Sequence, residues 1–185
     1  NRNNYFIGQN TGRKVTSGDN LIGIGDSVFQ NTTTADANIG IGYYSLRENT
    51  TGNLNIGIGT NTLRSTSTGY RNTAVGNNAA QTIIAGYDNT AIGYGAMIST
   101  GTTITGNTAL GSQTMWDMQG NNNVAAGFQS LFSTTTGDLS IAIGYQALYN
   151  GTSGDKNIAI GERAMYNGNP SGANNVALGA VALAN

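Results

Sequence analysis

The chain has 185 residues, a net charge of −1 and charged side chains at only 9% of its positions. Its eight basic residues are scattered, so no basic stripe can neutralise phosphates, and we expect no nucleic-acid partner. No apolar run approaches the ~20 residues of a membrane span, so we expect no membrane insertion. Cysteine and histidine are absent, which excludes disulfides, thiolate chemistry and imidazole bases.

A glycine recurs about every 17 residues from one end of the chain to the other. It anchors eleven units, at Gly8, Gly25, Gly42, Gly59, Gly76, Gly93, Gly111, Gly127, Gly144, Gly161 and Gly179. Positions within a unit are numbered from this anchor glycine, negative before it and positive after it. A fixed period of this length is typical of stacked coils. With no composition shift to mark a linker, we expect residues 1–185 to form one repetitive domain, and to be a segment of a longer chain.

Two columns ahead of the anchor glycine favour β-branched residues. Position −3 holds Tyr5, Ile22, Ile39, Ile56, Thr73, Thr90, Thr108, Val124, Ile141, Ile158 and Val176. Position −1 holds Ile7, Ile24, Ile41, Ile58, Val75, Ile92, Leu110, Ala126, Ile143, Ile160 and Leu178. A spacing of two between apolar columns predicts a short strand with one buried face, so we expect both columns to be buried.

A further apolar column lies at position +4. It holds Phe29, Leu46, Leu63, Ala80, Met97, Met115, Leu131, Leu148, Met165 and Leu183, and predicts a second short strand. Polar stretches with a recurring glycine, such as Asn49 to Gly52, predict turns between the strands. The expected fold is all-β: a flattened parallel β-solenoid, or β-roll, of eleven coils with two strands per coil. The sequence has no third apolar column, so it does not favour a three-sided helix.

Asparagine precedes the first predicted strand in most units. It occupies position −4 at Asn4, Asn38, Asn55, Asn72, Asn89, Asn107, Asn123, Asn157 and Asn175, while Leu21 and Ser140 depart from the pattern. Stacked amides can form a hydrogen-bonded ladder along the solenoid. Asparagine also suits a corner between a turn and a strand, and both interpretations are structural.

Position −2 admits only small residues in ten successive units. These are Gly23, Gly40, Gly57, Ala74, Ala91, Ala109, Ala125, Ala142, Ala159 and Ala177. Because this column alternates with the predicted core columns, we expect it to face outward. A water-exposed face would accept larger polar residues, so we expect the column to be the interface of a homo-oligomer. The alternative is that these residues only satisfy backbone geometry.

Several units resemble a known family of repeats. The segments Asn72 to Gly76, Ser140 to Leu148 and Asn175 to Gly179 are similar to the repeats of bacteriophage tail fibres, and also to the head repeats of trimeric autotransporter adhesins. The resemblance covers essentially the whole chain. It implies a homotrimeric, left-handed parallel β-roll that extends or displays a receptor-binding element.

The acidic residues suggest no enzyme. Four aspartates share position −6: Asp19, Asp36, Asp138 and Asp155. We interpret their recurrence as part of a repeated turn, and the alternative is a catalytic pair of carboxylates at Asp138 and Asp155. The aspartate-bearing repeat of calcium-binding β-rolls is absent, and no dinucleotide loop follows the Gly-Ile-Gly tripeptides. We therefore expect no catalytic residue, no metal and no cofactor.

An aromatic column stands at position +5 of four consecutive units, at Trp116, Phe132, Tyr149 and Tyr166. These rings could stack sugars of a host-cell surface, stack on each other, or pack between protomers. The function we expect is the shaft of a phage tail fibre that projects a receptor-binding element to a host glycan or protein, with an extracellular or virion location. The alternatives are an adhesin head on a bacterial surface, a polysaccharide depolymerase and, more remotely, an ice-binding solenoid.

Overall fold

The computed structural model describes residues 3–98, 103–133, 136–151, 153–167 and 172–184. Each unit contributes one three-residue strand. The strands are β1 (Tyr5–Ile7), β2 (Ile22–Ile24), β3 (Ile39–Ile41), β4 (Ile56–Ile58), β5 (Thr73–Val75), β6 (Thr90–Ile92), β7 (Thr108–Leu110), β8 (Val124–Ala126), β9 (Ile141–Ile143), β10 (Ile158–Ile160) and β11 (Val176–Leu178). They form one eleven-stranded parallel sheet in chain order, so the predicted parallel β-solenoid is confirmed.

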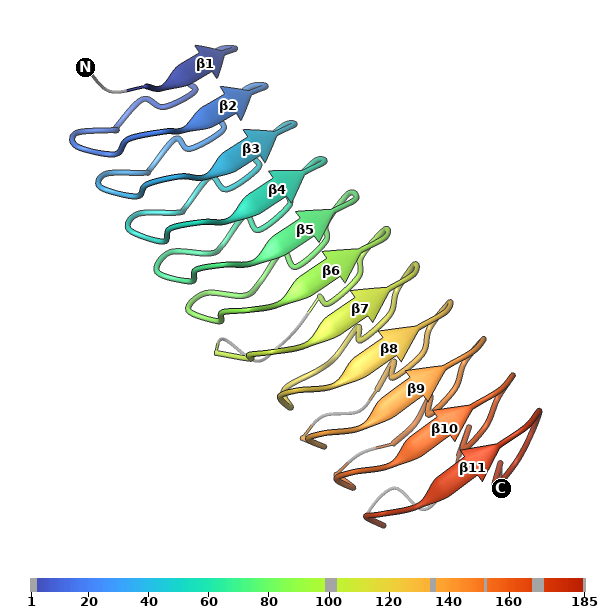
Figure 1. Cartoon of the computed structure of the whole chain (residues 1–185). Coiled ribbons are helices and arrows are strands. Elements are labelled where there is room, and N and C mark those ends of the chain that lie inside the picture. The colour runs from blue at the N-terminus through green and yellow to red at the C-terminus, as the bar shows by residue number, and fades with distance from the viewer. Residues whose placement is uncertain (1–2, 99–102, 134–135, 152, 168–171, 185) are drawn as a thin grey trace.

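The coils stack in register, with each residue above its counterpart one unit later. Gly40 pairs with Gly57, and Ala74 with Ala91. Figure 1 shows the consequence: the strands follow one another along a rod with the two ends of the chain at opposite ends. Each coil brings the chain back beside the preceding strand, so strands that are consecutive in the chain are neighbours throughout the sheet.

The anchor glycine is required by the close approach of successive coils. Its φ lies between 116° and 135° in every unit, a region that residues with side chains rarely adopt. A Cβ atom on Gly76 would also lie only 2.5 Å from the carbonyl oxygen of Gly93 in the next coil. Both backbone conformation and stacking therefore restrict this position to glycine.

The second predicted strand is wrong. Position +4 lies in a turn, and its residues have positive φ, for example 50° at Leu46 and 46° at Leu63. Position +2 is also left-handed, as at Tyr44, so this segment cannot be extended. Hydrogen bonds between coils nevertheless continue there: the backbone N–H of Leu63 donates to the carbonyl of Ala79 at 3.1 Å. Each coil thus has one strand and a tightly curled opposite side.

The predicted faces of the strand are inverted. The column at −2 is buried from Gly23 to Ala177, whereas no residue of the columns at −3 and −1 is buried. In β9, Ala142 has no exposed surface and Ile143 is 41% exposed. The reason is the thinness of the coil. The large side chains at +4 fill the interior, and only glycine or alanine fits opposite them on the strand.

The core therefore runs along the inside of the rod as a single column of large side chains with small residues beside it. Phe29, Leu46, Leu63, Met97 and Leu131 are all buried members of position +4. The interior also extends into the segment predicted as a polar turn, where Thr66, Ile83 and Met118 are buried at position +7. No helix of the length and apolar character needed to cross a bilayer occurs in the described ranges.

Candidate functional site

The most unusual surface of the molecule is the outer side of its sheet. We call the columns at positions −3 and −1, defined above, the outer strand face. Its residues include Ile92, which is 42% exposed, and Leu110, which is 40% exposed. Neither column contains a charged residue in any unit. Apart from Thr73, Thr90 and Thr108 the face therefore has the composition of a core, but it lies on the surface of the single chain, where apolar patches of more than a few hundred Å² mark interaction sites.

The size of this face can be estimated from strand geometry. Eleven strands ~4.8 Å apart give a length of ~50 Å, and the three strand residues from −3 to −1 at ~3.3 Å each give a width of ~10 Å. The product, roughly 500 Å², is more than half of the ~800 Å² that one partner contributes to a standard protein interface. A continuous surface of this size can support a specific complex.

The residues predicted as the oligomer interface lie elsewhere. Gly23, Gly40, Gly57, Ala74, Ala91, Ala109, Ala125, Ala142, Ala159 and Ala177 all face the interior of their own coil. A Cβ on Gly57, for example, would lie 2.7 Å from Oγ of Ser45 inside the chain. The restriction to small residues is real, but its cause is packing within the coil. These positions cannot contact a neighbouring protomer without unfolding.

The predicted asparagine ladder is present and buried. The Oδ1 atom of Asn55 accepts hydrogen bonds from the backbone N–H of Asn72 at 3.0 Å and from its Nδ2 at 3.1 Å. The Nδ2 atom of Asn55 donates to the carbonyl of Gly69 at 2.8 Å, which ties the strand side to the turn side. Ser140 replaces an asparagine with its hydroxyl, which accepts from the N–H of Asn157 at 3.1 Å. This column stabilises the stacking of the coils.

The aspartates at position −6 also connect coils. Asp155 Oδ1 accepts the backbone N–H of Asp138 at 2.9 Å, and Asp138 Oδ1 accepts that of Asn121 at 2.6 Å. Asp36 accepts from Asp19 in the same way at 2.8 Å. The recurrence is thus explained by inter-coil bonds, rather than by the local turns that the sequence suggested. Within the described ranges no group of three or more acidic residues could hold a metal ion.

The four predicted aromatic residues form a stack along the rod. The ring centroids are 6.0 Å apart from Trp116 to Phe132, 4.9 Å from Phe132 to Tyr149 and 5.1 Å from Tyr149 to Tyr166, with planes within 14° of parallel. Trp116 also packs against Gly95, where a Cβ would lie 2.7 Å from Cζ3 of the indole. Because ring faces are turned to one another, a sugar could reach mainly their edges. Glycan contact at this column stays a prediction.

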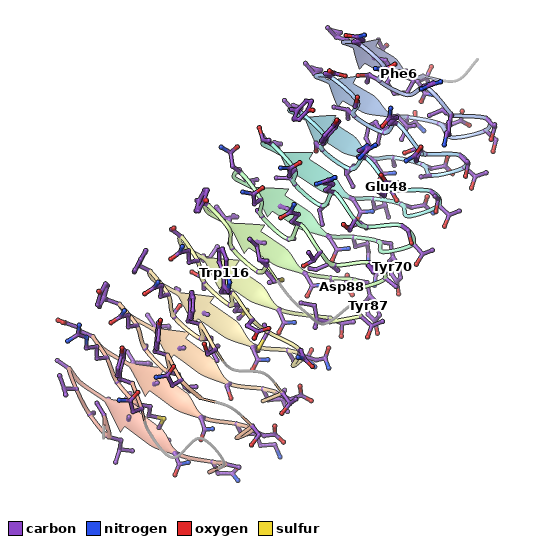
Figure 2. The ribbon with its side chains drawn as sticks, turned by 180° about the vertical axis from the view of Figure 1, so that it is seen from behind. Phe6, Glu48, Tyr70, Tyr87, Asp88 and Trp116 are labelled. Carbon is purple, nitrogen blue, oxygen red and sulfur yellow. The ribbon has the colours of Figure 1, made fainter. Side chains whose placement is uncertain are left out.

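Other exposed aromatic pairs were not singled out from the sequence. Tyr70 and Tyr87 stack at 4.9 Å, next to a bidentate ion pair in which Arg71 donates to Asp88 at 2.6 and 2.7 Å. These hydrogen bonds and the positive charge of Arg71 lower the pKa of the Asp88 carboxyl below its ordinary value. Figure 2 shows Tyr70, Tyr87 and Asp88 at one edge of the rod and Trp116 toward the opposite edge. The sequence does carry a signal for these contacts: Tyr70 and Tyr87 both stand at position −6, and Arg71 and Asp88 both at −5, of two successive units.

A second polar and aromatic group surrounds Tyr44. Tyr43 and Tyr44 stack with centroids 3.8 Å apart, and the guanidinium of Arg47 lies 4.6 Å from the Tyr44 centroid. A hydrogen bond between the two phenols raises the pKa of Tyr43 above its ordinary value. These contacts lie within one turn, at positions +1, +2 and +5 of the same unit, and this group has no arrangement of base, nucleophile and acid that would suggest catalysis.

Comparison with known proteins identifies no relative: no family model, no curated protein and no solved structure matches the chain. A proposal of its function therefore rests on the fold, on the exposed surfaces and on the repeat resemblance described above.

Proposed function

We propose that this chain is a self-associating shaft segment of an extracellular fibre. The observation that supports the proposal is the outer strand face, an uncharged apolar surface along the length of a regular rod. Exposed to water, such a face favours association, because burying it gains roughly 25 cal/mol per Å². A second rod with the same spacing of coils is the simplest surface that matches it over the full length.

We take the number of protomers and the location of the fibre from the resemblance described above. Tail-fibre repeats imply a homotrimer with a left-handed roll, and we propose both for this chain. A shaft needs length and stiffness, which stacked coils with buried ladders between them supply. In this proposal the segment extends a receptor-binding element from a virion toward a host surface and catalyses no reaction. The element's ligand, a host glycan or protein, is recognised outside the outer strand face.

The assembly step is tested by placing charge on that face. The triple variant Ile58→Asp, Ile92→Asp and Ile143→Asp puts carboxylates where the exposed columns would meet a neighbour. We expect the wild type to sediment as a trimer and the variant as a folded monomer with an unchanged circular dichroism spectrum. The matched control is Thr34→Asp, Thr68→Asp and Thr136→Asp, at exposed turn positions of three units, and should stay trimeric.

Two results would overturn the assembly proposal: a monomeric wild type at tens of micromolar concentration, or a triple isoleucine variant that remains trimeric. The proposed location on a virion needs a separate test. An antibody raised against this segment should label the tails of virions in electron microscopy, whereas labelling of a bacterial surface would point to an adhesin instead.

A further inference from the structure

The side of the coil opposite the strand carries a second surface, formed by the columns at positions +2 and +5. Position +4 of the same segment fills the core, whereas most residues at +2 and +5 are half-buried or exposed. The two columns touch, since the guanidinium of Arg47 at +5 lies 4.6 Å from the ring centroid of Tyr44 at +2. We call these two columns the arginine strip. Because it lies across the coil from the outer strand face, it does not compete with that face for a partner.

The charges of the arginine strip are all of one sign. Its two columns contain Arg13, Arg47, Arg64 and Arg163 and no aspartate or glutamate in any unit, although the whole chain has a net charge of −1. Half of the eight basic residues therefore gather here, and all of those are arginines. Arginine is typical of surfaces that hold carboxylate or phosphate groups, because its planar fork donates two parallel hydrogen bonds.

Two of these arginines are anchored in the same way. Nε of Arg47 donates to Oε1 of Gln30 at 2.7 Å, and Nε of Arg163 donates to Oε1 of Gln146 at 3.2 Å. Each glutamine lies one coil before its arginine. The bond fixes the base of the guanidinium, and in the described part of the chain no hydrogen-bond acceptor takes the terminal Nη atoms. Two oriented forks are thus left with their outer donors unused.

Aromatic rings limit the movement of the arginines further. The guanidinium of Arg163 lies 5.7 Å from the ring centroid of Tyr145 and 5.6 Å from that of Tyr166. Arg64 lies 5.4 Å from Tyr44 of the coil before it. Neither Arg64 nor Arg163 has a carboxylate partner within the described ranges. A guanidinium that is already stacked loses little further freedom on binding, so these side chains are prepared for an anion.

A row of amides runs along the second half of the strip. Nε2 of Gln129 donates to Oε1 of Gln113, and Nε2 of Gln146 donates to Oε1 of Gln129, both at 2.9 Å. A primary amide has two hydrogens, so the ladder leaves one donor on each of these two side chains. Asn61 and Asn78 form the same kind of bond nearer the N-terminus, at 3.2 Å. Amides one coil apart, ~4.8 Å, suit a ligand that itself repeats along the rod.

We propose that the arginine strip binds a linear acidic polysaccharide laid along the rod. Sugar carboxylates bind the guanidinium forks of Arg47, Arg64 and Arg163, and sugar hydroxyls bind the glutamine ladder. The exposed ring edges at +5, such as that of Tyr149, offer apolar contact to the C–H groups of the sugars. This inference goes beyond the shaft function proposed above and does not require self-association.

Two other polyanions suit the strip less well. A single-stranded nucleic acid stacks its bases on ring faces, but the faces at +5 are turned to one another, with the centroids of Phe132 and Tyr149 4.9 Å apart. An acidic peptide would satisfy the arginines, but it has no array of hydroxyls for the glutamine ladder. Both serve as competing probes in the test.

The probes for the test are polygalacturonate and alginate, two linear polymers in which every sugar carries a carboxylate. In isothermal titration we expect at least one of them to bind, and dextran, polyglutamate and oligothymidine to bind at least about tenfold more weakly. From Arg47 to Arg163 the strip spans seven coil spacings, ~34 Å, so a disaccharide of the same acid reaches only one fork and should bind far more weakly than the polymer.

A matched pair of double variants locates the site. Arg64→Gln with Arg163→Gln removes two forks from the strip and should lower the affinity at least about tenfold. Arg71→Gln with Lys156→Gln removes the same charge at position −5, outside the strip, and should leave the affinity nearly unchanged. Equal losses in the two variants would mean attraction by net charge alone and would overturn the site.

The remaining outcomes are equally decisive. If neither acidic polymer binds, the strip is not a polysaccharide site, and equal binding of polyglutamate or oligothymidine overturns the assignment to sugar. Sedimentation and urea unfolding of each variant show whether a lost affinity has a structural cause. A monomeric wild type that binds polygalacturonate through the two forks would support this site and overturn only the assembly proposed above.

Discussion

The side chain of Val28 occupies the space that a side chain at Gly40 would need. A Cβ atom on Gly40 would lie 2.5 Å from Cγ1 of Val28, which stands at position +3 of the preceding coil. The two residues face each other across the thin interior, so the size of one limits the size of the other. Later coils solve the same problem differently, with alanine at both places, as at Ala91 and Ala79.

This relationship predicts a compensated pair of substitutions. Gly40→Ala should lower the free energy of unfolding by about 1–3 kcal/mol, because the added methyl group overpacks the coil. Adding Val28→Ala should recover most of that loss, since the pair then matches Ala79 and Ala91. Urea unfolding at one protein concentration measures both. If the double variant is less stable than Gly40→Ala alone, the two side chains do not compete for this space.

The left-handed backbone at position +4 predicts an unusual ranking of apolar side chains. Leu63 has a φ of 46°, a conformation that β-branched residues avoid. Leu63→Ile keeps the volume but should cost about 2 kcal/mol or more from backbone strain. Leu63→Met should cost less than about 1.5 kcal/mol, because methionine occupies this position at Met97 and Met115. Equal thermal stabilities for the two variants would contradict this explanation.

The same column shows what the sequence could and could not predict. The period, the parallel coils, the asparagine ladder and the burial of position +4 all follow from in-register repetition. The second strand was wrong because apolar periodicity reports burial and not backbone conformation. A signal was nevertheless present: from Phe29 to Leu183, position +4 never holds valine, isoleucine or threonine, as expected for residues with positive φ.

The inverted strand faces have a different cause. Alternation with a period of two separates two faces but does not say which one is inside. Large apolar residues are usually the buried set, and in this chain the exposed set includes Ile58 and Ile143. Which face is buried depends on how close the two sides of the coil lie, as at Gly57 against Ser45. That distance cannot be read from the sequence of a single unit. The inverted assignment is why the sequence predicts the interface at the small residues of position −2, whereas the structure makes the outer strand face the candidate interface.

The anchor glycines allow backbone strain and steric clash to be separated. Gly76 and Gly179 have similar φ values of 125° and 116°, but a Cβ on Gly76 would meet Gly93, whereas one on Gly179 would have nothing within 4 Å. Gly179→Ala should therefore show the strain alone, about 1–3 kcal/mol. Gly76→Ala adds a clash with backbone and should cost clearly more. Comparable losses in chemical denaturation would mean that the coils separate easily.

The asparagine ladder predicts effects in both directions. Asn55→Ala removes the acceptor for the N–H of Asn72 and the donor to Gly69, inside the protein. Leaving these two buried groups unpaired should cost about 2–6 kcal/mol, at 1–3 kcal/mol for each. Conversely, Ser140→Asn restores the repeat pattern and should raise the melting temperature. A destabilised Ser140→Asn variant would show that this corner has adapted to the smaller hydroxyl.

The aromatic stack at position +5 predicts energetic coupling between neighbouring coils. Phe132 and Tyr149 are nearly parallel, with planes 4° apart and centroids 4.9 Å apart. Pairs in this geometry contribute about 0.5–1.5 kcal/mol beyond the area they bury. A double-mutant cycle with Phe132→Ala and Tyr149→Ala should therefore give a coupling energy in that range. The measurement is urea unfolding of the wild type, both single variants and the double variant at equal concentration.

A matched cycle controls for general weakening of the rod. Phe132 and Tyr70 lie several coils apart and share no contact in the structure, so Phe132→Ala and Tyr70→Ala should be additive within ~0.5 kcal/mol. The same variants test whether the stack binds sugar. Because the faces of Phe132 and Tyr149 cover each other, we expect Tyr149→Ala to lower stability, and adsorption of the folded variant to host polysaccharide tests the predicted glycan contact separately. Loss of adsorption in a fully folded Tyr149→Ala variant would show that a sugar reads the exposed edge of this column.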